Sequence, residues 1–346
     1  MPDRRPRARV TSFDVAEHAG VSQSTVSRAL ANSSAITEAT RARVIKSAEE
    51  LGYMVDARAA QLRQGRTGTL AVVVICRPDE PPSEINPFYF SLLGSVCAAA
   101  SGQGYQTLVS FQASADQLFG KYEESGQADG VIVIGTTSND AAWQYFRSIS
   151  ADNRSVVFWG SPFDDLEWIR SDNYEGGLIA ARHLIAAGYR NIVHLGAVDS
   201  PQRQFRERYE GYAQGMAEAG LVPRLQQVDY TDDRATQGHK AIRALMDAGD
   251  PFDALFVACD SIALGAMEEL RISGISVPEQ CGLVGFDGVR AGIHTSPPLT
   301  SIEPDFDVAG AMLVANVLGA SAMGTAARPV AERRVPVRLL ERGSVK

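Results

Sequence analysis

A short N-terminal segment carries four polar side chains whose chemistry suits the reading of DNA bases: Gln23, Ser24, Ser27 and Arg28. In the major groove a glutamine amide matches the edge of adenine, and a guanidinium matches guanine. Serine hydroxyls can bond either bases or phosphates. Val26, Ala29 and Leu30 share the opposite helical face, so the segment is predicted to be a helix with an outward polar face.

Three hydroxyl side chains predict where the helices of this region begin: Thr11, Ser22 and Thr37. Asp14 follows Thr11 by three residues, which is the spacing of a capping box. Gly20 and Gly52 are predicted to end the first and third helices. Helix, glycine-containing turn and helix form the helix-turn-helix arrangement, whose second helix enters the major groove. Thr11 and Ser22 therefore join the predicted DNA contacts, and the alternative is an ordinary three-helix bundle with a polar face.

The charge of the chain is unevenly distributed. Residues 1–66 carry 11 Lys and Arg against 7 Asp and Glu, a net charge of +4. Residues 67–346 carry 22 basic against 34 acidic residues, a net charge of −12. This division predicts that only the N-terminal head approaches a polyanion.

From about residue 69 onward, short β-rich runs alternate with longer helical stretches. The predicted strands are 70–76, 106–111, 130–134, 155–159, 191–195, 254–259 and 281–286. The predicted helices are 88–100, 176–187, 206–219, 234–248 and 261–273. Apolar strands that alternate with helices indicate an α/β core of parallel, doubly wound sheets covered on both faces. Such sheets bind ligands at the C-terminal ends of their strands, and two lobes of this kind can close over a ligand.

The composition argues against several other classes of protein. Hydrophobic residues make up 45% and charged residues 21% of the chain, as in globular proteins. No apolar run is long enough to span a bilayer, and the N-terminus does not read as a secretory signal, so a cytoplasmic protein with no membrane partner is expected. The cysteines are expected to be free thiols: Cys76, Cys97, Cys259 and Cys281. Because no dinucleotide fingerprint, P-loop, metalloprotease motif or nucleophile elbow is present, no cofactor, metal or enzymatic activity is expected.

Two stretches of the head closely resemble the lactose-repressor (LacI) family of bacterial transcriptional regulators. They are Asp14–Ser22 and Thr25–Leu30, and Glu50–Tyr53 extends the likeness downstream. The stretch 57–62 resembles the hinge helix of that family, in which the leucine matching Leu62 inserts into the minor groove. One departure is Met54-Val55-Asp56, which stands where the family usually has Pro and Asn.

The resemblance implies a specific domain organisation. Residues 1–56 would form a small all-α helix-turn-helix head, 57–66 a hinge helix and linker, and 67–346 a core that binds an effector and dimerises. The core would be a two-lobed, periplasmic-binding-protein-like α/β domain. Its first lobe is expected at about 67–170 and 301–330, and its second at about 171–300 and 331–346.

The resemblance also nominates contacts to a small effector: Phe88, Tyr89, Asp172, Asn173, Arg208, Tyr230, Asp260 and Asp287. Asp287 follows Gly282–Phe286, a run similar to the family's Val-Gly-Phe-Asp, whose carboxylate accepts hydrogen bonds from sugar hydroxyls. An acid that ends an apolar strand also needs polar partners. Arg208 precedes Gly211 by three residues, where the family has an arginine that bonds the effector.

The other predicted effector contacts are chosen because they lie near the ends of predicted strands. Phe88 and Tyr89 resemble aromatics that border the effector in the family, although they could simply pack the lobe interface. Tyr230 matches a position that is often aromatic and contacts the effector. Asp260 resembles an Asn-Asp step of the family and could instead cap the helix that follows it. Asp172 and Asn173 lie where the chain is expected to cross between the lobes.

The resemblance implies a homodimer that binds near-palindromic operator DNA and responds to a small molecule. The implied activity is repression of carbohydrate-utilisation genes, with operator affinity changed by a sugar-like effector that alters the angle between the lobes. A purine or nucleoside acting as corepressor remains an alternative, and a pure solute-binding protein is a weaker one. The last predicted strand is not followed by a heptad helix, so a dimer rather than a tetramer is expected.

Overall fold

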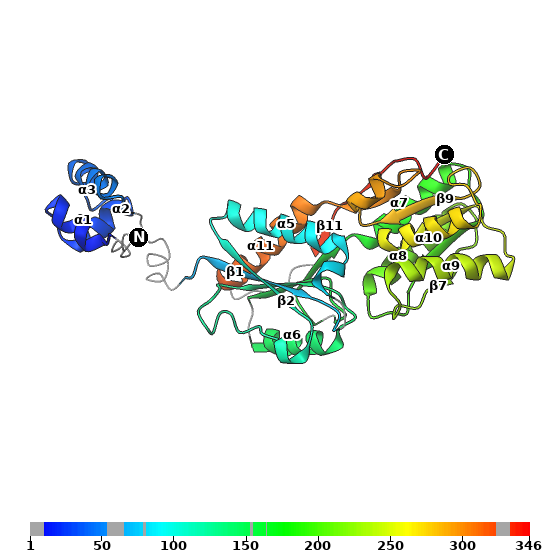
Figure 1. Ribbon diagram of the computed structural model, residues 1–346, viewed down its shortest axis with the longest axis horizontal. Helices are drawn as coiled ribbons and strands as arrows, with labels where there is room; N and C mark the ends of the chain where they lie inside the picture. The colour runs from blue at the N-terminus through cyan, green and yellow to red at the C-terminus, as the bar shows by residue number, and fades with distance from the viewer. Residues whose placement is uncertain (1–9, 54–65, 79–80, 153–154, 164, 323–332) are drawn as a thin grey trace, which may run out of the picture. The chain divides into compact units, whose positions relative to one another are not determined.

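The computed structural model describes residues 10–53, 66–78, 81–152, 155–163, 165–322 and 333–346 (Figure 1). The chain forms two compact units, Met1–Arg66 and Thr67–Lys346. The predicted contact at Leu62 and nearly all of the predicted hinge lie outside the described residues. Within the described part of the chain, no helix combines the length and apolarity needed to cross a membrane.

Residues 10–53 of the first unit form a bundle of three short helices: α1 (Ser12–Ala19), α2 (Gln23–Leu30) and α3 (Glu38–Leu51). The predicted helix starts are confirmed, since Thr11 and Asp14 form a capping box and the Ser22 and Thr37 hydroxyls cap α2 and α3. The bundle encloses a small apolar core contributed by all three helices: Val15, Ala16, Ala19, Val26, Ala29, Val44 and Ala48. This packing turns the polar side of α2 outward.

The second unit contains two mostly parallel sheets, as predicted. The first sheet has the order β11-β5-β4-β3-β1-β2. Its strands are β1 (Thr69–Ile75), β2 (Gln106–Gln112), β3 (Val131–Gly135), β4 (Val156–Trp159), β5 (Trp168–Ser171) and β11 (Arg334–Val335). Helices α5 (Pro87–Gly102) and α11 (Phe306–Ala322) pack together on one face, and α6 (Asp140–Asp152) covers the other (Figure 1).

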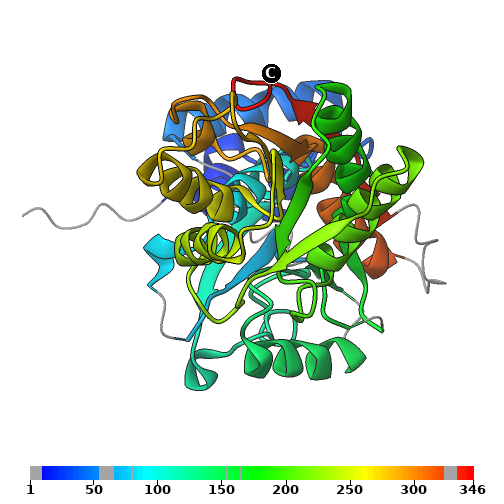
Figure 2. The same ribbon diagram turned by 90° about the vertical axis from the view of Figure 1, so that its right-hand side faces the viewer.

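The second sheet has the order β12-β10-β9-β8-β6-β7, and only β12 runs antiparallel to its neighbour. Its strands are β6 (Ile192–Gly196), β7 (Arg224–Gln227), β8 (Ala254–Val257), β9 (Gly282–Phe286), β10 (Thr300–Pro304) and β12 (Val337–Leu340). The helices of this lobe are α7 (Asn173–Ala186), α8 (Arg203–Glu218), α9 (Arg234–Ala248) and α10 (Asp260–Ile272). The pair α7 and α8 covers one face and the pair α9 and α10 the other (Figure 2).

Strand β1 shows why both faces of the sheet are covered. Its side chains alternate between two cores, with Leu70, Val72 and Val74 facing α5 and α11. The residues between them face α6 and are equally buried. A strand that is apolar at every position therefore serves two cores at once, which explains the continuous apolar runs in the sequence.

The chain crosses between the lobes three times, and the crossings are bonded to one another. Backbone N–H groups of Asp172 and Asp305 donate to the carbonyls of Val335 and Pro336, at 2.8 and 2.9 Å. Two lobe boundaries differ from those expected from the sequence. Strand β10 was expected in the first lobe from residue 301 but pairs with β9 in the second, and β11 was expected in the second lobe but pairs with β5 in the first. The chain returns to the first lobe after β10, because the next helix, the apolar α11, packs against α5 there.

Helices α7 and α8 approach closely because each has a glycine at the contact. A methyl group at Gly177 would collide with the backbone carbonyl of Arg208, and one at Gly211 would collide with that of Tyr174. Substituting either glycine forces the two helices apart, which would displace every side chain that they carry toward the edge of the sheet.

The substitution Gly211→Ala is therefore expected to lower the free energy of unfolding by roughly 1–3 kcal/mol. The matched control is Gly102→Ala at the end of α5, where an added methyl group meets open space. Denaturant unfolding of both variants should show loss for Gly211→Ala and no loss for Gly102→Ala. Equal stability of Gly211→Ala and the parent chain would contradict the close helix contact.

Candidate effector pocket and DNA-reading helix

The outward side of α2 carries the predicted base contacts. Ser24 and Arg28 are exposed and lie one helical turn apart, whereas Gln23 and Ser27 are half-buried beside them. The Gln23 amide donates a hydrogen bond to the Ser12 hydroxyl at 3.2 Å, which orients it toward the start of α1. These four side chains form one polar strip from the N-terminus of α2, as a base-reading helix requires.

Two other predicted DNA contacts already use their hydroxyls within the head. The Thr11 hydroxyl donates to the Asp14 carboxylate at 2.7 Å, and the Ser22 hydroxyl accepts from the N–H of Thr25 at 3.2 Å. Both residues are exposed, but their side chains hold the starts of α1 and α2. The structure thus shows Thr11 and Ser22 as helix caps, and their contact with DNA stays a prediction.

Four of the eight nominated effector residues meet in one pocket between the lobes of the core: Phe88, Tyr89, Arg208 and Asp287. This central pocket lies at the C-terminal ends of the strands of both sheets, where doubly wound folds bind ligands. Its cavity volume is about 30 Å³, which is the space of about one water molecule. The pocket is therefore closed around its own side chains.

Arg208 lies at the centre of this pocket and is 5% exposed. Its Nε donates to Asn173 Oδ1 at 3.0 Å, Nη1 donates to the Ala258 carbonyl, and Nη2 lies 3.5 Å from Asp287 Oδ1. The guanidinium also stacks 3.5 Å from the centre of the Phe286 ring. Burial lowers the pKa of Arg208, and the nearby Asp287 carboxylate opposes that shift. The side chain is thus a charged donor fixed in one orientation.

Asp287 provides the opposing acceptor and is held in a strained backbone conformation. Its φ of 114° lies in the region that favours glycine, so the surrounding structure must hold it there. Burial raises the pKa of Asp287, and the charge of Arg208 counteracts this effect. The Asn86 amide, from the first lobe, donates to Asp287 Oδ2 at 3.3 Å. One carboxylate therefore bonds groups from both lobes.

Asn173 and Asp172 sit behind the pocket. Asn173 is fully buried, and its amide donates to Glu207 Oε2 at 3.1 Å while its carbonyl oxygen accepts from Arg208. Asp172 caps α7 and lies 3.9 Å from a guanidinium nitrogen of Arg334. Neither residue lines the central pocket, so the structure makes Asn173 a group that orients Arg208 and Asp172 a helix cap.

The structure does not bring Asp260 into the pocket, which corrects the expectation of an effector contact. Its carboxylate accepts from the Ser301 hydroxyl at 2.7 Å and from the Val289 N–H at 2.8 Å. It does not cap α10 either, because Cys259 occupies the cap position. Burial raises the pKa of Asp260 to about 8. The side chain turns toward β10 because Gly285 leaves room for it there.

Phe88 and Tyr89 lie between the central pocket and the first-lobe core. Each lines the central pocket and is also part of the first-lobe core. Their rings meet edge to face at 5.4 Å, and Phe88 lies 5.8 Å from Trp159 and 5.4 Å from Phe306. A ligand in the pocket would therefore contact a rigid aromatic wall.

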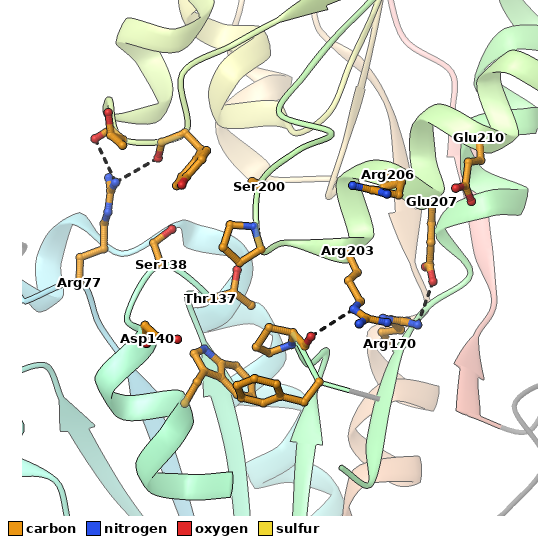
Figure 3. Close-up of a pocket in the computed structure, with 16 residues that line it drawn as sticks. Arg77, Thr137, Ser138, Asp140, Arg170, Ser200, Arg203, Arg206, Glu207 and Glu210 are labelled. Atoms are coloured by element: carbon orange, nitrogen blue, oxygen red, sulfur yellow. Dashed lines mark hydrogen bonds and ion pairs between the residues drawn. The ribbon is translucent and has the colours of Figure 1, made fainter. Parts of the chain in front are cut away.

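Tyr230 lies elsewhere, in a larger neighbouring cavity of about 880 Å³ that we call the outer cavity (Figure 3). Figure 3 shows Arg77 at one side of it and Arg203 and Arg206 at the other, with Thr137 between them. Arg77 crosses the lobes and donates to the backbone carbonyls of Tyr230 and Thr231 at 3.2 and 3.1 Å. Tyr230 and Asp287 thus belong to adjoining cavities.

The sequence analysis missed six polar side chains of the central pocket: Asn86, Arg170, Ser171, Gln202, Gln204 and Arg234. Arg234 donates to Gln202 at 2.7 Å and lies 4.9 Å from the centre of the Phe205 ring. Gln202 precedes α8 and Arg234 begins α9, so both stand where a helix starts after a strand. That position, at the ligand-binding edge of the sheet, was a signal that could have identified them.

The chain combines a helix-turn-helix unit with a two-lobed core, and that core has a polar pocket at the C-terminal ends of its strands. This combination defines the class of DNA-binding regulators with a ligand-sensing domain. The family described as "Bacterial regulatory proteins, lacI family" matches residues 13–56, and "Periplasmic binding protein-like domain" matches residues 181–345. The chain is 31% identical over 312 residues to the HTH-type transcriptional regulator CelR of Thermobifida fusca, covering 88% of this chain and 89% of that protein. The chain therefore belongs to the LacI family of transcriptional regulators.

Other comparisons agree with this membership. The HTH-type transcriptional repressor CytR of Escherichia coli (strain K12) is 28% identical over 315 residues, covering 89% of each chain. The structure of a CelR–cellobiose complex is 28% identical, with a TM-score of 0.65 over 97% of this chain and 100% of that one. A lac repressor dimer bound to operator and the anti-inducer ONPF is 24% identical, with a TM-score of 0.73 over 97% of this chain and 99% of that one, and supports the fold.

The substitution Arg208→Lys is expected to lower the free energy of unfolding by roughly 1–3 kcal/mol, because one ammonium nitrogen cannot reach the acceptors on Asn173, Ala258 and Asp287 that three separate guanidinium nitrogens contact. The control is Arg206→Lys on the same helix, where the exposed guanidinium bonds only the Val198 carbonyl among the described contacts. Thermal unfolding of both variants provides the measurement. If the two substitutions had the same small effect, the buried network around Arg208 would not have the structural role described above.

Proposed function

We propose that this regulator represses carbohydrate-utilisation genes and that a sugar-like effector changes its affinity for operator DNA. The observation that carries the proposal is the buried pair of Arg208 and Asp287 facing the pocket between the lobes. The guanidinium only donates hydrogen bonds and the carboxylate only accepts them, and a ring bearing several hydroxyls satisfies both kinds of group. The aromatic side chains Phe88 and Tyr89 suit the apolar face of such a ring. The CelR–cellobiose complex, in a relative of the same fold, supports a sugar.

The contacts across the pocket suggest how the ligand acts. Asn86 from the first lobe and Arg208 from the second both bind Asp287, so the lobes are joined through this carboxylate. A sugar that takes over these hydrogen bonds would replace the direct bond between lobes with a bridged one and change the angle between them. We propose that this change shifts the equilibrium between a state that binds operator and one that does not.

The proposed DNA binding is assigned to the N-terminal head. We assign base contacts to Gln23, Ser24, Ser27 and Arg28 because they form one strip along α2, and we keep Leu62 as a proposed minor-groove contact on the family resemblance. The protein would act as a cytoplasmic homodimer, each head reading half of a near-palindromic operator. The lac repressor dimer on operator, which shares the fold, supports this assembly.

Arg28→Ala is expected to weaken specific operator binding by roughly 1–3 kcal/mol, about five- to 150-fold, because a bidentate contact to guanine is lost. Arg271→Ala, which removes the same charge from an exposed position on α10, should leave operator affinity unchanged. Fluorescence anisotropy with the DNA upstream of the gene measures both at one salt concentration. Specific binding unaffected by Arg28→Ala would remove α2 from the role of recognition helix.

Asp287→Ala is expected to weaken sugar binding at least about thirtyfold, because one partner of a buried charge pair is removed. Operator affinity without sugar is measured alongside, because the substitution also removes the hydrogen bond from Asn86 that joins the two lobes. Asp250→Ala, at an exposed carboxylate of the same lobe, serves as the control. Calorimetric titration with sugars and anisotropy with operator give the two readouts, and a variant with full sugar response would exclude Asp287 from the site.

A further inference from the structure

One arginine side chain ties the two lobes of the core together across the cleft. Arg77 follows β1 of the first lobe, and its guanidinium donates to three consecutive backbone carbonyls of the second lobe. Nη2 donates to the carbonyls of Tyr230 and Thr231 at 3.2 and 3.1 Å (Figure 3), and Nη1 lies 3.5 Å from that of Asp232. The rigid fork of donors on a guanidinium allows one side chain to serve several neighbouring carbonyls at once.

The receiving loop, between β7 and α9, is held in one shape by its own side chains. The N–H and the hydroxyl of Thr231 donate to Asp229 Oδ1 at 2.9 and 2.7 Å. The Asp232 carboxylate accepts from Lys240 at 2.9 and 2.8 Å, and Asp233 caps α9. The carbonyls are therefore already oriented, and the three carboxylates of the loop add attraction for a cation on the facing lobe.

This contact lies at the side of the cleft farthest from the crossings between the lobes. The crossings leave the first sheet at β5 and the second sheet at β10, whereas the contact joins the ends of β1 and β7. In the sheet orders, β1 is three strands from β5 and β7 is four strands from β10. At the usual strand spacing these separations are about 14 and 19 Å. A rotation about the crossings therefore separates the lobes most at this side of the cleft.

The other charged contacts between the lobes lie closer to the crossings. Arg170, on β5, pairs with Glu207 at 2.8 Å, and Arg334, on β11, donates to the same carboxylate at 3.2 Å. Arg203 donates at 3.1 Å to the carbonyl of Pro162, which follows β4 beside β5. Because groups near an axis of rotation move little, these contacts can persist while the far side of the cleft opens.

Arg77 also stands between two cavities of the cleft. It lines the outer cavity and a further cavity of about 350 Å³, and that further cavity shares Asn86, Tyr89, Gln202 and Arg234 with the central pocket. The central pocket itself has only about 30 Å³. The lobes must therefore part before a ring can enter it.

We propose that Arg77 is a latch whose bonds to the loop 230–232 hold the cleft closed from the side opposite the crossings and must break before any ligand reaches Asp287. Arg77 does not line the central pocket, so it controls access to the site and takes no part in recognising the ligand. The latch goes beyond the proposed sugar response, because it does not depend on which ligand binds. It lowers the apparent affinity of every ligand of the pocket by the fraction of molecules that are open.

Two cysteines of the second lobe report on opening without any ligand. Cys259 lines the central pocket, is 2% exposed, and has its pKa raised by burial to about 11, so its thiol reacts only when the pocket opens. Cys281 is fully buried just before β9, at the opposite end of the strands from the pocket. It reacts only when the lobe itself unfolds, and it therefore serves as an internal control.

The test is alkylation of the full-length chain by N-ethylmaleimide at one pH, with each cysteine followed by mass spectrometry of a tryptic digest. Arg77→Ala is expected to accelerate the reaction of Cys259 about tenfold, because the loss of bonds from a charged donor raises the population of the open state. The rate at Cys281 should not change. The control Arg182→Ala removes the same charge from a pair with Glu218 within the second lobe and should leave both rates unchanged.

Three results would overturn the latch. The first is an unchanged rate at Cys259 in Arg77→Ala. The second is equal acceleration at Cys259 and Cys281, which would show a loss of stability of the lobe in place of an opening of the cleft. The third is an acceleration of Cys259 by Arg182→Ala as large as that by Arg77→Ala. Since the reaction contains neither sugar nor DNA, these outcomes are independent of whether the proposed sugar response succeeds or fails.

Discussion

A fully buried guanidinium must have its charge balanced and its donors satisfied, and this requirement at Arg208 constrains the whole second lobe. Asp287 balances the charge from the end of β9, and Asn173 accepts a hydrogen bond from the start of α7. These partners can reach Arg208 only if α7 and α8 lie in close contact, which Gly177 and Gly211 allow. The glycines, the buried pair and the strained backbone at Asp287 are therefore parts of one arrangement.

The same arrangement connects the pocket to the geometry of the core. Asp287 also accepts a hydrogen bond from Asn86 of the first lobe, so the group that would receive a ligand is one of those that hold the lobes together. The three crossings between the lobes are bonded through backbone groups next to Asp172 and Asp305, which leaves the lobes joined by a narrow set of strands. Ligand exchange at a single carboxylate can thus alter the relation between the lobes without disturbing either core. We propose this as the physical basis for a sensor whose output is a change in the angle between the lobes.

The sequence predicted what is determined locally and missed what depends on tertiary contacts. Helix caps at Thr11, Ser22 and Thr37 depend on neighbouring residues, and the continuous apolar strands reflect burial on both faces. Strands β5 and β7 were not among the predicted strands, because neither is a continuous apolar run: β5 includes Arg170 and Ser171, and β7 alternates between half-buried and exposed positions at a sheet edge. Asp260 was nominated by its place after a strand, but a side chain there can turn either way, and the space above Gly285 decided the direction. Which polar side chains share a cavity depended on how the two lobes meet.

The central claim is that sugar and operator act on the same equilibrium of one molecule, and reciprocal binding tests it most directly. Sugar affinity is measured by calorimetry with and without saturating operator DNA, and operator affinity by anisotropy with and without saturating sugar. Thermodynamic linkage requires each ligand to change the affinity of the other by the same factor. The account predicts equal factors of about five or more, whereas a sugar that binds operator-bound and free protein with the same affinity would contradict it.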